Sequence, residues 1–144
     1  MSQSIEIYWP DFNQTIKAGL LSELNAELCT QFLKTLPFKS IQSHAVVAGK
    51  QMYFPYRLNG SSKHYSEAMD KQPIGRINIE LDFQYLSINY GPMTEPVPAV
   101  PVAQVDDGDI ELLQQIGEKV WHNLLFEDRY LQVHVRWAGD DVYE

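Results

Sequence analysis

Two short apolar stretches that flank a glycine constrain the fold of this chain more than any other feature. Residues 41–48 and 51–58 are rich in apolar and β-favouring side chains, and Gly49-Lys50 lies between them. Two such runs on either side of a turn predict a β-hairpin. Pro55 has no N–H group to donate to a neighbouring strand, so the second strand is expected at a sheet edge or at a bend.

The predicted hairpin carries polar groups on strands that otherwise build a core. Side chains alternate between the two faces of a strand. This alternation places Ile41, Ser43, Ala45 and Val47 on one face and Gln42, His44, Val46 and Ala48 on the other. In the second strand Tyr53 and Pro55 oppose Met52, Phe54 and Tyr56, and Arg57 follows at the end. The mouth of a ligand-binding barrel would need such polar groups, whereas simple packing would also use aromatic residues and a lone histidine.

Composition limits the classes of function. The chain has 144 residues and one cysteine, Cys29, with a net charge of −8. This length predicts a single domain spanning residues 1–144. An acidic chain without a Lys/Arg cluster is not expected to bind nucleic acid. We find neither an apolar run long enough to span a membrane nor a secretion signal, and a single cysteine fits a reducing compartment. A cytoplasmic protein without a membrane partner is therefore predicted, and a homo-oligomer stays open.

The rest of the chain alternates between strands and two amphipathic segments. Strands are expected at 4–9, 14–20, 102–105 and 129–137, and two more within 74–91 on either side of Asp82-Phe83. Helices are predicted near 25–36 and 109–124, capped by Asn25 and Asp109. The proline-rich segment 92–101 is expected to be a stiff loop that forms a pocket wall. The whole pattern predicts a mainly β fold, a closed antiparallel barrel of about eight strands with two helices plugging its ends.

Two further segments carry candidate functional groups. The polar segment 59–73 is expected to be a long loop from which Lys63, His64 and Tyr65 could reach a ligand. In the strand that follows, Arg76, Asn78 and Glu80 share one face, which is either solvent or a polar cavity. Carboxylates at Glu80 and Asp82 could hold a divalent cation such as Ca²⁺ or Mg²⁺.

Several short motifs resemble bacterial cyclophilin-like proteins. These are LPF at 36–38, HAVVAG and MYFP in the hairpin, the glycine at 75, NYGP at 89–92, and VWHN in the second helix. Within that family the chain is most similar to opine synthases of the mikimopine or cucumopine type, especially across SIQSHAVVAGKQMYFPYRL. The resemblance implies a cyclophilin-like barrel that condenses L-histidine with 2-oxoglutarate in a Pictet–Spengler-type cyclisation.

The implied reaction sets requirements for the site. The attacking amine must be neutral, an acid must protonate the departing hydroxyl, and a base must take the proton of the imidazole ring. We assign His44 or Glu80 as the base and Tyr53 or Tyr90 as the proton donor. Cationic groups must hold the substrate carboxylates, and the candidates are Arg57 with Lys63 or Arg76. Tyr56 and Glu95 are expected to contact substrate.

Other functions remain open at this point. No organic cofactor is required by the implied reaction, although a divalent cation could replace one carboxylate anchor. The main alternative is a non-catalytic cyclophilin-like module that binds a small ligand or a peptide, and a different cyclase or carbon–nitrogen lyase on the same barrel is a third. The first two interpretations differ in whether an acid and a base converge within about 3 Å of one reacting atom.

Overall fold

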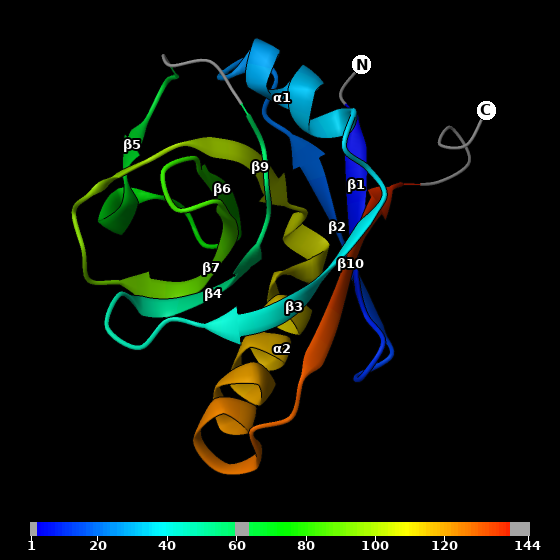
Figure 1. The fold of residues 1–144 in the computed structure, drawn as a ribbon. Helices are drawn as coiled ribbons and strands as arrows, with labels where there is room; N and C mark the ends of the chain where they lie inside the picture. Colours follow the sequence, from blue (N-terminus) through cyan, green and yellow to red (C-terminus); the bar gives the residue numbers. More distant parts are fainter. Residues whose placement is uncertain (1–2, 60–63, 139–144) are drawn as a thin grey trace.

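The computed structural model describes residues 3–59 and 64–138, and most of its strands belong to one barrel. The barrel strands are β1 (Ser4–Trp9), β2 (Gln14–Leu20), β3 (Phe38–His44), β4 (Gly49–Pro55), β6 (Arg76–Glu80), β7 (Tyr85–Met93), β9 (Pro101–Val105) and β10 (Leu131–Trp137). They close in the order β1-β10-β3-β4-β7-β6-β9-β2 with antiparallel pairing throughout (Figure 1). The mainly β, closed antiparallel barrel predicted from the sequence is confirmed.

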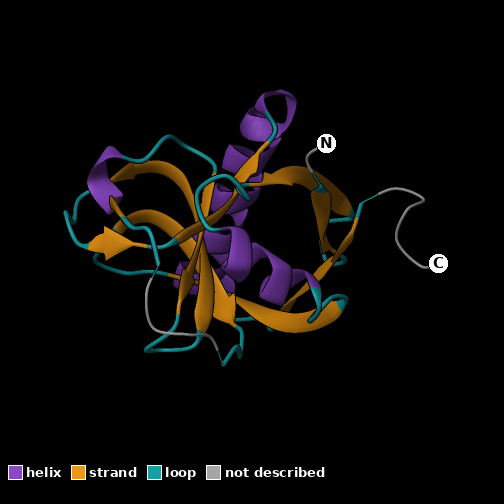
Figure 2. Cartoon of the chain, turned by 90° about the horizontal axis from the view of Figure 1, so that it is seen from above, coloured by secondary structure: helices purple, strands orange, loops and turns teal. Residues whose placement is uncertain are grey.

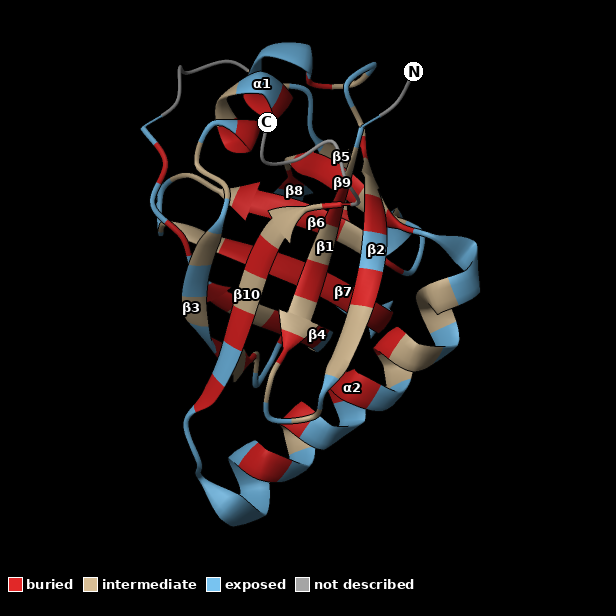
Figure 3. Cartoon of the chain, turned by 90° about the vertical axis from the view of Figure 1, so that its right-hand side faces the viewer, coloured by how far each residue is buried: buried red, intermediate tan, exposed pale blue. Residues whose placement is uncertain are grey.

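Two α-helices accompany the barrel, as predicted. They are α1 (Ala26–Leu33) and α2 (Ile110–His122). Figure 3 shows α1 over one end of the barrel and α2 running across the other end. In the view of Figure 2, the helices lie in the middle with strands curving to either side. The smaller elements are a ribbon of β5 (Glu67–Ala68) with β8 (Pro98–Ala99), and the helical turns η1 (Met69–Lys71), η2 (Asp107–Asp109) and η3 (Asn123–Glu127). Among the described residues, no helix is long and apolar enough to cross a membrane.

Alternation of burial explains why the sequences of β1 and β10 form barrel strands. Along β1, Ile5, Ile7 and Trp9 are buried while the residues between them are half exposed, and Ile7 pairs with buried Ile16 of β2. The same alternation is visible along β10 in Figure 3. A fully buried Ile or Leu side chain contributes about 1.5–3 kcal/mol, so the inward row fixes the register of these two strands.

The turn of the central hairpin lies earlier than predicted. Strand β3 ends at His44 and β4 begins at Gly49, so residues 45–48 form the turn and Gly49-Lys50 belongs to the strand. Gly49 has φ 117°, and a Cβ atom there would lie 2.7 Å from the carbonyl oxygen of Pro92. The glycine is therefore explained by close backbone contact with the end of β7 and not by a turn.

The two predicted faces of β3 are correct, but the polar one points inward. Gln42 and His44 are buried, whereas Ile41 is 50% exposed. Gln42 is accommodated because its Oε1 accepts a hydrogen bond of 2.8 Å from Nε1 of buried Trp9. Buried polar groups are tolerated when they are hydrogen-bonded in this way.

Asn25 and Asp109 occupy the predicted N-cap positions, but neither side chain makes a capping hydrogen bond, because long-range partners occupy both side chains. Asn25 precedes α1, but its Nδ2 donates to the carbonyl of Pro101 and its Oδ1 accepts from the N–H of Tyr65. Asp109 precedes α2, and its Oδ2 accepts from the N–H of Lys17 at 2.8 Å. These side chains tie the helix starts to neighbouring strands instead of capping them.

The predicted helix ends also shift. Helix α1 ends at Leu33, three residues before the predicted end at 36, and a tight turn leads into β3. Helix α2 ends at His122 and passes into the wider turn η3, which leaves Leu124 42% exposed in place of its predicted buried position.

Helix α2 approaches β7 closely at a glycine. A Cβ atom at Gly117 would lie 2.5 Å from the ring of Tyr90. The ring therefore occupies the space that any other side chain at this position would need. This contact sets the distance between α2 and the barrel wall that carries Tyr90.

Candidate active site

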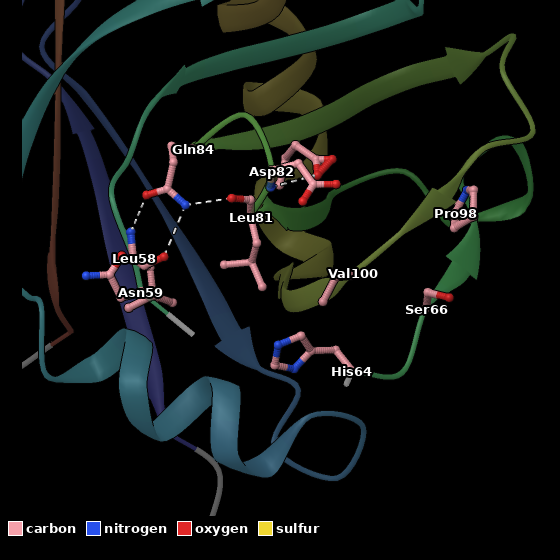
Figure 4. A pocket seen from close by; sticks show the side chains of 10 residues that line it. Leu58, Asn59, His64, Ser66, Leu81, Asp82, Gln84, Pro98 and Val100 are labelled. Atoms are coloured by element: carbon pink, nitrogen blue, oxygen red, sulfur yellow. Dashed lines mark hydrogen bonds between the residues drawn. The ribbon is translucent and has the colours of Figure 1, made fainter. Parts of the chain in front are cut away.

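Two adjoining pockets lie at the barrel end where β6 and β7 are joined. We call pocket A the cavity of about 600 Å³ lined by Leu58, Asn59, His64, Ser66, Glu80, Leu81, Asp82, Gln84, Pro98 and Val100 (Figure 4). Pocket B has about 550 Å³ and is lined by Ala48, Gln51, Met69, Asn78, Ile79, Glu80, Asp82, Phe83, Tyr85, Ser87, Glu95 and residues 97–100. Glu80, Asp82, Pro98 and Val100 line both cavities and form their shared wall.

Glu80 takes its place in the shared wall from the local strand geometry. It is the last residue of β6 and pairs across the turn with Tyr85, the first residue of β7. Burial is the main cause that raises the pKa of Tyr85, and the charges of Glu80 and Tyr53 add to it. Tyr85 is therefore a neutral phenol at pH 7, close to a carboxylate and able to donate a hydrogen bond into pocket B.

A strained glutamine holds the turn between these strands. Gln84 has φ 60°, a left-handed conformation that is uncommon for a residue other than glycine or asparagine. Its side chain accepts from the N–H of Leu58 at 2.8 Å and donates to the carbonyls of Leu58 and Leu81 (Figure 4). The hydrogen bonds fix the chain around Leu58 against the turn, so one wall of pocket A is preorganised.

The polar side chains on the floor of pocket B are held by a buried amide network. Asn78 exchanges two hydrogen bonds with Gln72, of 2.9 and 3.0 Å. Gln72 also accepts from Asn89, and Asn89 in turn accepts from Gln51 at 3.1 Å. Such a network fixes the orientation of Gln51 and Asn78 in the pocket.

Arg76 belongs to an internal ion pair. Its Nε and Nη2 donate to the two carboxylate oxygens of Glu67 at 3.0 and 2.7 Å, and both side chains are largely buried. Hydrogen bonding from Arg76 is the largest cause that lowers the pKa of Glu67. The pair joins β5 to β6, and neither pocket A nor pocket B is lined by Arg76.

His44 and Tyr90 form a separate pair in a third cavity. Pocket C, of about 350 Å³, is lined by His44, Lys50, Tyr90, Thr94, Glu118, Trp121 and the hairpin turn. The carbonyl of Ala45 can only accept, so Nδ1 of His44 donates to it at 2.6 Å and Nε2 accepts from the hydroxyl of Tyr90 at 2.7 Å. Burial lowers the pKa of His44 and raises the pKa of Tyr90 to about 12. Both groups are neutral at pH 7, and both ring nitrogens of His44 are engaged.

The remaining predicted site residues are dispersed. Glu95 lines pocket B together with Glu80 and Asp82. Tyr53 lines a cavity between β3 and η3, with its ring 5.2 Å from that of Tyr85. Tyr56 is buried and hydrogen-bonded to Thr35. Arg57 is exposed and precedes Leu58, which lines pocket A. Lys63 lies outside the described residues.

The two carboxylates predicted to hold a divalent cation lie in the shared wall. Glu80 and Asp82 both line pockets A and B. Within the described parts of the chain, no three His, Cys, Asp or Glu side chains form a group that could hold a metal ion. A divalent cation at Glu80 and Asp82 stays a prediction.

Two residues of this site were not assigned a role from the sequence. Tyr85 could have been found from the hairpin, because a four-residue turn at 81–84 pairs residues 80 and 85. Gln84 gives no local signal, since its importance comes from contacts with Leu58, 26 residues away.

Comparison with known proteins yields two informative structural neighbours. The structure of McbB in complex with tryptophan matches with a TM-score of 0.85 and 34% identity, over 97% of this chain and 46% of McbB. This chain therefore spans less than half the length of McbB. A hypothetical protein from Archaeoglobus fulgidus matches with a TM-score of 0.64 and 13% identity over 95% of both chains, which shows a shared fold. No protein-family model and no curated protein sequence matches the chain.

Proposed function

We propose that this protein catalyses a Pictet–Spengler-type condensation between an amino acid with a nucleophilic heteroaromatic ring and a carbonyl compound. The observation that carries the proposal is the position of Glu80 in the shared wall of two adjoining cavities. A reaction that joins two substrates needs two binding spaces that meet at the catalytic group. The specific substrates proposed are L-histidine and 2-oxoglutarate.

The comparison with McbB supports the amino-acid half of this proposal. The McbB structure contains tryptophan, and this chain is 34% identical to McbB over 97% of its own length. Tryptophan and histidine are both amino acids whose side-chain ring has a nucleophilic carbon at a similar distance from the amine. Each pocket also has a volume in the usual range for sites that bind small molecules.

The proposed chemistry balances without a redox cofactor. The free amine attacks the carbonyl carbon to give a carbinolamine, which takes up one proton and loses water to form an iminium ion. A ring carbon then attacks the iminium carbon, and loss of the proton from that ring carbon restores aromaticity. The products are the cyclised amino acid and one water molecule.

Glu80 is the proposed base for both proton removals. Its carboxylate takes a proton from the substrate ammonium, returns it to the hydroxyl that leaves as water, and later accepts the ring proton. Tyr85, which pairs with Glu80 across the turn, is the proposed hydrogen-bond donor to the developing oxygen charge. His44 is a poorer choice as base because its two ring nitrogens already bind Ala45 and Tyr90.

A direct assay tests the proposal. The purified chain is incubated with L-histidine or L-tryptophan together with 2-oxoglutarate, and the mixture is analysed by mass spectrometry. The expected product has the summed mass of the two substrates less one water. With an amino acid deuterated at the attacking ring carbon, the product should lose that deuterium.

The deuterium readout separates cyclisation from simpler outcomes. A reversible imine has the same mass as the cyclised product but retains ring deuterium and reverts on dilution. Binding of the amino acid without any product would instead favour the non-catalytic binding module.

A further inference from the structure

His64 is a pocket residue whose polar atom has no partner among the described residues. Its Nε2 is buried and makes no hydrogen bond there. Figure 4 shows the imidazole ring directed into pocket A beneath Leu81 and Val100, with Asp82 on the far side of the cavity. A buried polar atom without a partner is unfavourable, so a ligand atom that hydrogen-bonds to this nitrogen would be favourable.

Pockets A and B differ in the chemistry of their linings. Pocket B combines the carboxylates of Glu80, Asp82 and Glu95 with the aromatic rings of Phe83 and Tyr85. Such a lining fits an amino acid with an aromatic side chain. The carboxylates attract its ammonium group, and its ring can pack against the rings of Phe83 and Tyr85.

Pocket A offers mainly amide, imidazole and hydroxyl groups away from the shared wall. These groups are the side chains of Asn59, His64 and Ser66. Gln84 also lines this cavity, but its amide is already bound to Leu58 and Leu81. N–H and O–H donors fit the oxygens of a carbonyl compound better than they fit an ammonium ion.

We propose that pocket A is the subsite for the carbonyl substrate, that His64 binds an oxygen of this substrate through Nε2–H, and that pocket B receives the amino acid. This assignment rests on the proposed two-substrate condensation and names the residue that orients its electrophile. It brings the carbonyl carbon and the amine together beside Glu80, where the two cavities adjoin. His64 is thus a substrate-binding residue of the reaction.

Steady-state kinetics of His64→Ala and His64→Gln test the assignment. With the amino acid saturating, His64→Ala should raise KM for the carbonyl substrate about tenfold or more, as expected for the loss of one buried hydrogen bond. The KM for the amino acid should change less than twofold. His64→Gln keeps an N–H donor and should recover part of the loss, which a purely structural role would not predict.

Two carbonyl substrates identify which oxygen His64 contacts. 2-Oxoglutarate carries carboxylates, whereas acetaldehyde has only the carbonyl oxygen. An effect with both substrates assigns His64 to the carbonyl oxygen, and an effect with 2-oxoglutarate alone assigns it to a carboxylate. His122→Ala is the matched control, because His122 is an exposed histidine on α2 outside both pockets, and it should leave both KM values unchanged.

Calorimetry separates failure of the assignment from failure of the proposed reaction. If the chain forms no product, binding of 2-oxoglutarate that weakens about tenfold in His64→Ala would still support the subsite. Equal KM values for wild type and His64→Ala, an equal rise in KM for the amino acid and for the carbonyl compound, or no binding of either carbonyl compound to the wild-type chain would overturn it.

Discussion

Pocket C and the shared wall of pockets A and B both contain titratable side chains, but these side chains differ in how far the protein itself satisfies them with hydrogen bonds. In pocket C, His44 is bonded at both ring nitrogens, to the carbonyl of Ala45 and the hydroxyl of Tyr90. In the shared wall, the one hydrogen bond that the side chain of Glu80 makes among the described residues is a long one of 3.4 Å from the N–H of Asp82. In pocket C the polar groups are hydrogen-bonded to each other and to the backbone, whereas the shared wall leaves a carboxylate available to a ligand.

The difference shows that residue type alone does not identify a general base. An unperturbed histidine titrates closer to neutral pH than a glutamate, which makes it attractive from the sequence. Its value as a base depends on a free ring nitrogen, and the fold uses both nitrogens of His44 internally. Access to two adjoining cavities instead favours Glu80.

The largest expected effect follows from removing the charge at the shared wall. Glu80→Gln keeps the shape of the side chain but cannot accept a proton at neutral pH. We expect kcat to fall by about a hundredfold or more, the usual contribution of a general base, with little change in melting temperature. Stopped or continuous product assays measure the rate, and calorimetry checks that the amino acid still binds.

A matched substitution controls for a general loss of negative charge. Glu111→Gln changes an exposed glutamate on α2 that lines neither pocket. It should keep full activity. Equal activity of Glu80→Gln and wild type would remove Glu80 from the mechanism.

The second prediction concerns the stability of pocket C and its pH dependence. Burial lowers the pKa of His44 from its ordinary value of 6.5 in the folded chain. The unfolded chain therefore binds a proton at higher pH than the folded chain, so this contribution to stability is complete above pH 6.5 and is lost as the pH falls below it. His44→Gln should cost about 1–3 kcal/mol at pH 7.5 and weaken the loss of stability on acidification.

Denaturant unfolding between pH 5 and 8 measures this effect. Because the pKa of His134 is also lowered, the informative quantity is the difference in slope between His44→Gln and wild type. Retained turnover with reduced stability is expected for a structural histidine. A loss of rate of about a hundredfold without a change in stability would return the role of base to His44.

The third prediction addresses the contact that holds Tyr90 beside His44. Gly117→Ala would place a Cβ atom 2.5 Å from the Tyr90 ring unless α2 or the ring moves. We expect a loss of about 1–3 kcal/mol in the free energy of unfolding, as for other overpacked cores. Gly108→Ala is the matched control, since a Cβ there meets nothing within 4 Å. Equal stability of the two variants would mean that α2 adjusts freely.

The smallest expected effect concerns the predicted carboxylate anchor. Arg57 is exposed next to Leu58, which lines pocket A. An exposed ion pair contributes about 0–1 kcal/mol, so Arg57→Ala should raise KM for 2-oxoglutarate only a few-fold and leave KM for acetaldehyde unchanged. A near-complete loss of turnover would show that Arg57 closes over the substrate.

Most of the fold could be predicted because its signals are local. The alternation in Ile5, Ile7 and Trp9 and the apolar stripe of Leu28 and Phe32 follow directly from the periods of strand and helix. The position of the central turn could not be predicted. Gly49 resembles a turn residue, but it is required by the backbone of Pro92, which is distant in sequence.

The site was predicted less completely because its parts come together only in three dimensions. Glu80, Asp82 and Glu95 were named from the sequence and do line one cavity. The engagement of His44 by Tyr90 and of Arg76 by Glu67 depends on contacts 46 and 9 residues apart, which no local pattern reveals. The sequence shows which groups can titrate, whereas the fold determines which of them are free.

Mapping the amino-acid site by NMR tests the central comparison most directly. Wild-type protein labelled with ¹⁵N is titrated with L-histidine, and in parallel with L-tryptophan. We predict the largest amide shift changes at Asn78, Glu80 and Tyr85, around pocket B, with little change at Thr94 and Glu118 of pocket C. Shift changes concentrated at Thr94 and Glu118, with the Glu80 region unaffected, would contradict the assignment of the site to the shared wall.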